Sequence, residues 1–366
     1  MNFFNSPPVR RAMSKILLAF IFYVVAAASF NGFFGANAFM DRHDPRRSFQ
    51  VMFDDSAYKP FVYRQFMIKA AKEIRMLLTE ETQKNLIQEF KNYDIITSHH
   101  ARAKVEEKYL IEYHALYFMC FWFMFFSMFL IREIGIEITK SSVAGTLTAG
   151  AFTIIFPMIE WLWVYYDCAE IFFLSLATLL AIKGYWLALI LIAPIAEYNK
   201  ESFLFFVLTL YPLLAEKISV KKAAAVVTTS AFLSGLVYLY VSSIYAVNLG
   251  GNTEWHFYEH LQEFFSLHSW LTKYPFYGVY WGIGFFIPNT LMIAWLIKCT
   301  WKKLSATWKF HIKLALTINL PLFILFCQPN ELRNFSLMYI SFIAMLSIYI
   351  KDLITAKGED DFGTQG

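Results

Sequence analysis

The sequence is divided into ten apolar stretches that are separated by polar or charged connections. A membrane-spanning helix needs about 17–25 mostly apolar residues, and fewer where it is kinked or buried among other helices. The stretches cover residues 14–38, 111–131, 143–161, 168–182, 185–197, 202–215, 223–246, 277–297, 312–327 and 335–350. The sequence therefore predicts an all-α polytopic membrane protein with about ten transmembrane helices. The stretch 185–197 is short, and a non-spanning hairpin with 168–182 is the alternative for that pair.

The composition agrees with this class, because 58% of the residues are hydrophobic and 39 are Phe. Such values are typical of membrane proteins rather than of soluble domains. The four cysteines lie mostly within apolar stretches and show no metal or redox spacing, which favours a packing role. The net charge of +4 is explained by basic connections on one side of a membrane, so no nucleic-acid partner is predicted.

The distribution of Lys and Arg among the short connections predicts the orientation. If the N-terminus is cytoplasmic, sixteen basic residues fall on the cytoplasmic side and three, Lys200, Lys273 and Arg333, fall in short outer connections. Short cytoplasmic connections are enriched in Lys and Arg, so both termini are predicted to be cytoplasmic. A cleaved signal peptide, with Arg10-Arg11 and Ala36-Asn37-Ala38 as its landmarks, is the alternative for the first stretch and leaves the rest unchanged.

This threading predicts one membrane domain over residues 1–366 with two sizeable extracytoplasmic loops, 40–109 and 247–275, and a short cytoplasmic tail, 351–366. Helical patterns over 61–78 and 80–93 in the first loop are too charged to span, which predicts amphipathic helices on the membrane surface. The second loop carries Glu254, His256, Glu259 and His260. His256 and His260, or Glu259 and Glu263, stand at i,i+4, a spacing that is compatible with a metal, but an aromatic-rich interfacial helix is the favoured interpretation.

Candidate functional residues gather in the outer connections. In the first loop, Asp54 and Asp55 follow a short apolar run that resembles a strand, and Tyr63 and Arg64 come soon after. Phenols, a guanidinium and carboxylates within a few residues can bind a sugar phosphate and accept a proton. The alternative is that this loop only caps the membrane body.

Three further clusters lie on the same predicted face. They contain Asp167 and Glu170, then Glu197, Asn199, Lys200 and Glu201, then Glu331 and Arg333. Ionisable groups at the ends of membrane helices are costly and often functional. The alternatives are a helix-capping role for Asp167, a solvated hairpin at 197–202 and an ordinary ion pair between Glu331 and Arg333.

Taken together, these features resemble the bacterial GT-C superfamily of integral-membrane glycosyltransferases. The resemblance is carried by Asp54-Asp55 in a long first outer loop, Tyr58 to Arg64, Tyr166 to Glu170, Asn199 to Ser202, and Glu331-Leu332-Arg333. It implies transfer of a sugar, with inversion, from a polyprenyl-phosphate carrier to a glycan or lipid acceptor. The implied location is the extracytoplasmic face of a bacterial inner membrane, with an acid of the first outer loop as base.

Roles follow from the resemblance and from the chemistry of a phosphate leaving group. Asp54 or Asp55 is the expected catalytic base, and Arg64, Lys200 and Arg333 are expected to bind the donor phosphate. The expected substrate-binding residues are Tyr63, Asp167, Glu170, Glu197, Asn199, Glu201 and Glu331. No cofactor is predicted, and a divalent metal is compatible but supported by no motif. A polysaccharide polymerase or ligase, a transporter of lipid-linked intermediates and a structural membrane subunit are the alternatives.

Overall fold

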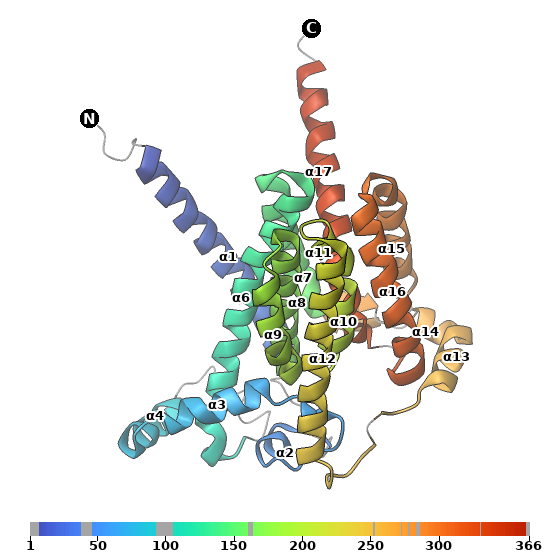
Figure 1. The fold of residues 1–366 in the computed structure, drawn as a ribbon. Helices are drawn as coiled ribbons and strands as arrows, with labels where there is room; N and C mark the ends of the chain where they lie inside the picture. Colours follow the sequence, from blue (N-terminus) through green and yellow to red (C-terminus); the bar gives the residue numbers. More distant parts are fainter. Residues whose placement is uncertain are drawn as a thin grey trace.

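The computed structural model describes residues 7–37, 46–92, 105–159, 164–251, 253–271, 273–276, 279–282, 286–329 and 331–363. Within these ranges the chain is almost entirely helical (Figure 1). The two strands, β1 (Lys273–Phe276) and β2 (Val279–Gly282), pair antiparallel as one short hairpin. The predicted all-α membrane class is therefore confirmed at this level.

Seven of the described helices are long and apolar enough to cross a membrane. They are α1 (Pro7–Asn37), α6 (Leu110–Thr139), α7 (Ser142–Ile159), α8 (Tyr165–Lys183), α12 (Val220–Ile244), α16 (Ala306–Phe326) and α17 (Tyr339–Gly363). Many of their large apolar side chains are exposed on the body, as a lipid-facing surface requires. These helices support a multi-pass membrane protein.

The other three predicted spans form shorter elements, so the count of ten is not confirmed. Residues 185–197 form α9 (Trp186–Asn199), and 202–215 form α10 (Phe203–Thr209) and α11 (Tyr211–Ala215). Pro212 stands in the first turn of α11, where proline is compatible with a new helix but not with continuation of the preceding one. In the third of these stretches, 277–297, residues 279–282 form β2 and α15 (Ile287–Thr300) begins at Ile287.

The first loop is helical, as predicted for most of it. The helices predicted over 61–78 and 80–93 are η2 (Phe61–Tyr63) with α3 (Phe66–Met76), and α4 (Glu80–Asn92). The strand-like interpretation before Asp54 is wrong, because this run forms α2 (Phe49–Phe53). Phe49, Met52 and Phe53 are all buried, and their i, i+3, i+4 spacing places them on one helical face. A short helix, η3 (Glu107–Tyr109), leads into α6.

The helices α6 and α7 approach each other closely next to the turn that joins them. A Cβ on Gly145 would lie 2.6 Å from the carbonyl oxygen of Arg132, and one on Gly135 would lie 2.9 Å from the Cα of Gly145. Small residues at such crossings let two helix backbones approach and pack tightly inside a membrane. The helix α8, whose side chains are mostly buried, packs against α6 on another side.

The second loop contains α13 (Phe257–Phe265) and α14 (Leu267–Leu271), which confirms a helix in this region. Trp255 and Phe265 are exposed, whereas His260 is buried and its Nε2 lies 2.9 Å from the carbonyl oxygen of Cys327. The exposed aromatic face agrees with the predicted contact with lipid, which stays a prediction. At the other end of the chain, α17 continues to Gly363 through most of the predicted tail.

Figure 1 shows the body as a bundle with two distinct ends. The start of α1 and the end of α17 lie at one end, whereas α2, α3, α4 and α13 lie at or near the other. Several long helices, among them α6, α12 and α16, run between the two ends. Each end contains a cavity, and the two cavities are lined by different residues.

Candidate functional site

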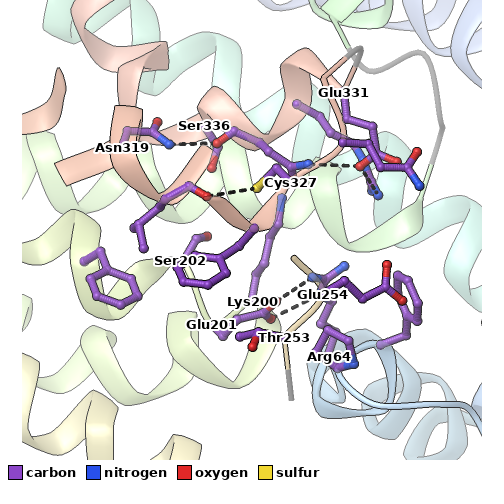
Figure 2. A pocket seen from close by; sticks show the side chains of 18 of the residues that line it. Arg64, Lys200, Glu201, Ser202, Thr253, Glu254, Asn319, Cys327, Glu331 and Ser336 are labelled. Carbon is purple, nitrogen blue, oxygen red and sulfur yellow. Dashed lines mark hydrogen bonds and ion pairs between the residues drawn. The ribbon is translucent and has the colours of Figure 1, made fainter. Parts of the chain in front are cut away.

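A cavity of about 420 Å³ lies at the end of the body that carries α2 and α3, and we call it the arginine cavity (Figure 2). Its charged lining residues are Arg46, Arg47, Arg64, Lys200, Glu201, Glu254, Glu331 and Arg333. Its apolar wall includes Leu204, Phe205, Leu322, Phe326 and Leu337. The cavity thus combines cations and carboxylates with an apolar surface at the end of membrane helices.

Arg64 enters the cavity from the segment between η2 and α3. Its Nε donates to Glu201 Oε2 at 3.0 Å, and a second guanidinium nitrogen donates to Glu201 Oε1, which makes the pair bidentate. The guanidinium also donates to the hydroxyl of Tyr166 and lies 4.5 Å from the centre of that ring. Such a paired and stacked geometry fixes the direction of the Arg64 donors.

Lys200 lies in the turn between α9 and α10 and joins two acids of α8. Its Nζ donates to Asp167 Oδ1 at 2.9 Å and to Glu170 Oε2 at 2.6 Å. The other oxygen of Glu170 accepts a bond from Ser202 Oγ at 2.7 Å. Asp167 therefore does not act as the N-cap predicted as the alternative, since Val164 occupies the N-cap position of α8 without a side-chain bond.

Arg333 brings the C-terminal part of the chain into the same cluster. It lies in η5 (Leu332–Met338), where its guanidinium donates to Asp167 Oδ2 at 3.2 Å and to Glu331 Oε2 at 3.3 Å. It also donates to the hydroxyl of Tyr166 at 3.4 Å. Arg64, Lys200 and Arg333 thus form one ion-pair network, although long stretches of sequence separate them.

Buried charges of opposite sign keep the cavity carboxylates ionised. Burial by itself raises the pKa of Glu201, but the adjacent Arg64 outweighs this effect and holds that pKa below its usual value. Burial likewise opposes ionisation of Glu331, and Arg333 and Arg47 lower its pKa overall. Both carboxylates are therefore anions that bind the cations, and both are weak proton acceptors.

A second polar pair lies in the stretch before α13. Glu254 and His256 both line the cavity, and the Nε2 of His256 lies 3.3 Å from Glu254 Oε2. The Nδ1 of the same ring contacts Glu259, and the His256 backbone N–H donates to the carbonyl oxygen of Leu325 at 2.9 Å. Glu254 is more accessible than the other cavity acids, with 41% of its side chain exposed.

Three predicted substrate-binding residues support the cluster instead of lining the cavity. Asn199 Nδ2 donates to the carbonyl oxygen of Tyr166 at 2.9 Å, and Glu197 accepts from the backbone N–H of Leu204 at 2.7 Å. Tyr63 packs edge-on against Tyr238, with 5.8 Å between the ring centres. Asp167 and Glu170 also lie behind the lining, where they hold Lys200.

The structure places Asp54 and Asp55 outside the lining of the cavity. The hydroxyl of Tyr109 donates to Asp54. Asp55 pairs with Lys72 at 3.1 Å and Lys69 at 3.4 Å, and it accepts from the Tyr245 hydroxyl at 3.1 Å. Burial raises the pKa of Asp55, but the bond and charge of Lys72 prevail and lower it. The catalytic role of this doublet stays a prediction.

The sequence predicted no site role for Tyr166, Arg46 or Arg47, and it favoured an interfacial helix for the segment that contains Glu254 and His256. Tyr166 was named only as the start of the stretch Tyr166 to Glu170, yet its hydroxyl accepts from both Arg64 and Arg333. The only signal in the sequence was its position next to Asp167. Among the described residues, no group of three or more His, Cys, Asp or Glu side chains is arranged to hold a metal ion.

Comparison with known proteins assigns no relative: no family model, no curated protein and no solved structure matches this chain.

Proposed function

We propose that the arginine cavity transfers a sugar from a polyprenyl-phosphate donor to a glycan or lipid acceptor. The observation that carries this proposal is the composition of the cavity. Arg64, Lys200 and Arg333 converge in one network beside an apolar wall at the end of membrane helices. A lipid-linked sugar phosphate presents the same combination, with an anionic phosphate, polar sugar hydroxyls and an apolar chain.

The phosphate is bound by the cations that now hold carboxylates. Glu201 is the displaceable partner of Arg64, because 29% of its side chain is exposed, whereas the side chain of Asp167 is fully buried behind Lys200. A phosphate that replaces Glu201 accepts the two hydrogen bonds that Arg64 now donates to this carboxylate, and the guanidinium moves little. Donors that are held in place before the reaction stabilise the charge that develops on the leaving phosphate.

The acceptor hydroxyl attacks the anomeric carbon of the donor sugar as the bond from that carbon to the phosphate oxygen breaks. The polyprenyl phosphate leaves with the bonding electron pair, and the hydroxyl proton passes to a carboxylate. We assign this proton to Glu254, because it lines the cavity, 41% of its side chain is exposed, and its ion pair with Arg46 is long, at 3.7 Å. Glu201 and Glu331 suit this task less, because neighbouring cations lower their pKa.

The proposed reaction takes place on the extracytoplasmic side of a bacterial inner membrane. The support is the charge rule for short connections, which assigns the cytoplasm to the opposite, lysine-rich end. With both termini in the cytoplasm, the arginine cavity opens toward the side where polyprenyl-linked sugars are used. This is a proposal about sidedness that cysteine accessibility at Thr253 and Ser305 would test directly, since these residues line cavities at opposite ends.

Mass spectrometry of envelope glycans and undecaprenyl-linked sugars tests the activity. We would compare cells that lack the protein with cells that carry the wild type or Glu254→Gln. The wild type should restore a sugar decoration, and Glu254→Gln should lower turnover by ~10²–10⁴ while the protein stays folded. The matched control is Glu259→Gln, which removes an acid from the same His256 but does not line the cavity.

The outcomes separate the alternatives. A change in glycan chain length without loss of a decoration would favour a polymerase, and no difference between any of the cells would refute the enzymatic proposal. If Asp54→Asn or Asp55→Asn abolishes transfer and Glu254→Gln does not, the base lies in the first loop, as the sequence predicted.

A further inference from the structure

A second cavity, of about 430 Å³, lies at the opposite end of the body, and we call it the lysine cavity. The cavity is lined by the end of α6, the end of α8, the α11 region, the start of α16 and the middle of α17. Its four cationic residues are Lys140, Lys217, Lys303 and Lys351. No arginine lines it, which distinguishes it from the arginine cavity.

Two of these lysines are already neutralised by acids of the cavity. Lys303 Nζ lies 2.7 Å from Asp352, and Lys140 Nζ lies 3.3 Å from Glu137, which also binds Lys183. Lys217 and Lys351 have no carboxylate partner within the part of the chain that the structure describes. The cavity therefore contains two ammonium groups that are available to an anion.

The N-terminal end of α16 adds a third source of positive potential. Ser305 caps this helix by accepting the backbone N–H of Trp308 at 3.3 Å, and both residues line the cavity. The first turn of a helix presents unpaired N–H groups and the positive end of its dipole, which favours phosphate. Leu213, Leu304 and Ile348 supply an apolar floor beside these groups.

We propose that the lysine cavity binds a phosphate group. The two exposed lysines without carboxylate partners and the capped end of α16 line one cavity, and together they suit a compact anion with several acceptor oxygens. The phosphate comes either from the headgroup of an anionic lipid in the adjacent leaflet or from a soluble phosphate compound. Basic cavities between membrane helices recognise lipid headgroups by this same chemistry.

Glu216 is the lining acid that opposes phosphate binding, so removal of its charge should raise the affinity for phosphate instead of lowering it. It has no cationic partner within the described residues. A bound phosphate is repelled by this carboxylate, so Glu216→Gln should strengthen binding. A site that responds only to packing would not respond in this direction.

The test uses the full chain, purified and reconstituted in nanodiscs, with two probes. Native mass spectrometry measures retention of phosphatidylglycerol against phosphatidylcholine, and the shift of thermal unfolding with inorganic phosphate measures binding of a soluble anion. The variant is Lys217→Gln, Lys351→Gln. The matched control is Lys221→Gln, Lys302→Gln, which removes the same charge at the same end of the body from residues that do not line the cavity.

We expect the cavity variant to weaken binding of one probe by roughly 30-fold, at about fivefold for each lysine near a membrane surface, and the control to change it little. Preferential loss of phosphatidylglycerol identifies a lipid ligand, and loss of the phosphate shift identifies a soluble one. Equal loss in variant and control, no binding of either probe, or no strengthening by Glu216→Gln overturns the proposal. None of these readouts depends on the activity proposed for the arginine cavity.

Discussion

The two cavities have nearly equal volumes, about 420 and 430 Å³, yet the ion pairs beside them differ in their exposure to solvent. Lys200 and Glu170 lie 2.6 Å apart with side chains 5% and 3% exposed. Lys303 and Asp352 lie 2.7 Å apart with side chains 55% and 35% exposed. The same pair of groups at the same distance is therefore buried at one end and solvated at the other. Burial decides whether such a pair fixes the structure or exchanges freely with solvent and ligand.

The largest expected effect tests this difference directly with Lys200→Met. The substitution keeps most of the length of the side chain but leaves Glu170 without a cation and Asp167 with Arg333 alone. Breaking a buried pair costs about 3–5 kcal/mol, because an uncompensated charge stays in a low-dielectric interior. Unfolding by SDS in mixed micelles would measure the loss.

The matched control is Lys303→Met at the opposite end. Its pair with Asp352 is exposed, so solvent compensates both charges and the expected loss is about 0–1 kcal/mol. Equal losses for the two variants would show that burial does not separate the two ends, and the comparison would fail.

The sequence predicted which ionisable residues share one end of the body. Threading by the basic connections assigned Asp167, Lys200 and Arg333 to one face, and the structure joins them in one network. It could not predict the partners, because Arg333 meets Asp167 across 166 residues of sequence and only the packing of α8 against η5 sets that distance. The contacts of the Tyr166 hydroxyl with Arg64 and Arg333 could not be predicted for the same reason.

The apolar stretches predicted which segments of the body are mostly helical, but they did not predict where each helix begins and ends. A run such as 202–215 is apolar throughout, and only Pro212 signals that it breaks into α10 and α11. The stretch 277–297 is equally apolar, yet its residues 279–282 pair as the second strand of a hairpin. Short apolar runs do not by themselves distinguish a strand from a buried helix, so these boundaries depend on tertiary contacts.

The next prediction concerns the shape of the cation rather than its charge. Arg64→Lys keeps the charge but removes the fork that binds Glu201 and the contact with Tyr166. We expect a loss of about 1.5–3 kcal/mol, because at least one charge-assisted hydrogen bond cannot form. At the solvated end, Lys351→Arg should change the free energy of unfolding by less than about 0.5 kcal/mol. A similar response to both exchanges would mean that directed donors matter equally at the two ends.

Acid should reduce the contribution of Glu201 to the free energy of unfolding within a defined range of pH. The pKa of Glu201 is below its usual value of 4.5 in the folded chain, because Arg64 prevails over burial. Its contribution to stability is therefore complete above pH 4.5 and is lost as the pH falls through the lower, folded-state pKa. The difference in unfolding free energy between wild type and Glu201→Gln should be constant from about pH 8 to pH 5 and shrink below about pH 4.5. A decline that begins near pH 6 would contradict the assignment.

The smallest expected effect is the response of the two ends to salt. Raising the ionic strength from about 0.1 to 1 M shortens the screening length from about 10 to 3 Å, which weakens exposed pairs and leaves buried pairs almost unchanged. The cost of Lys303→Met should therefore fall from at most about 1 kcal/mol toward zero, since salt removes the interaction that the substitution removes. The cost of Lys200→Met should keep its value, because water and ions do not reach Asp167, whose side chain is fully buried.

Unfolding titrations of both variants and the wild type at the two salt concentrations measure these differences. Parallel changes for both lysines would place them in equally solvated surroundings, and the distinction between the two cavities would then lie only in their residue types.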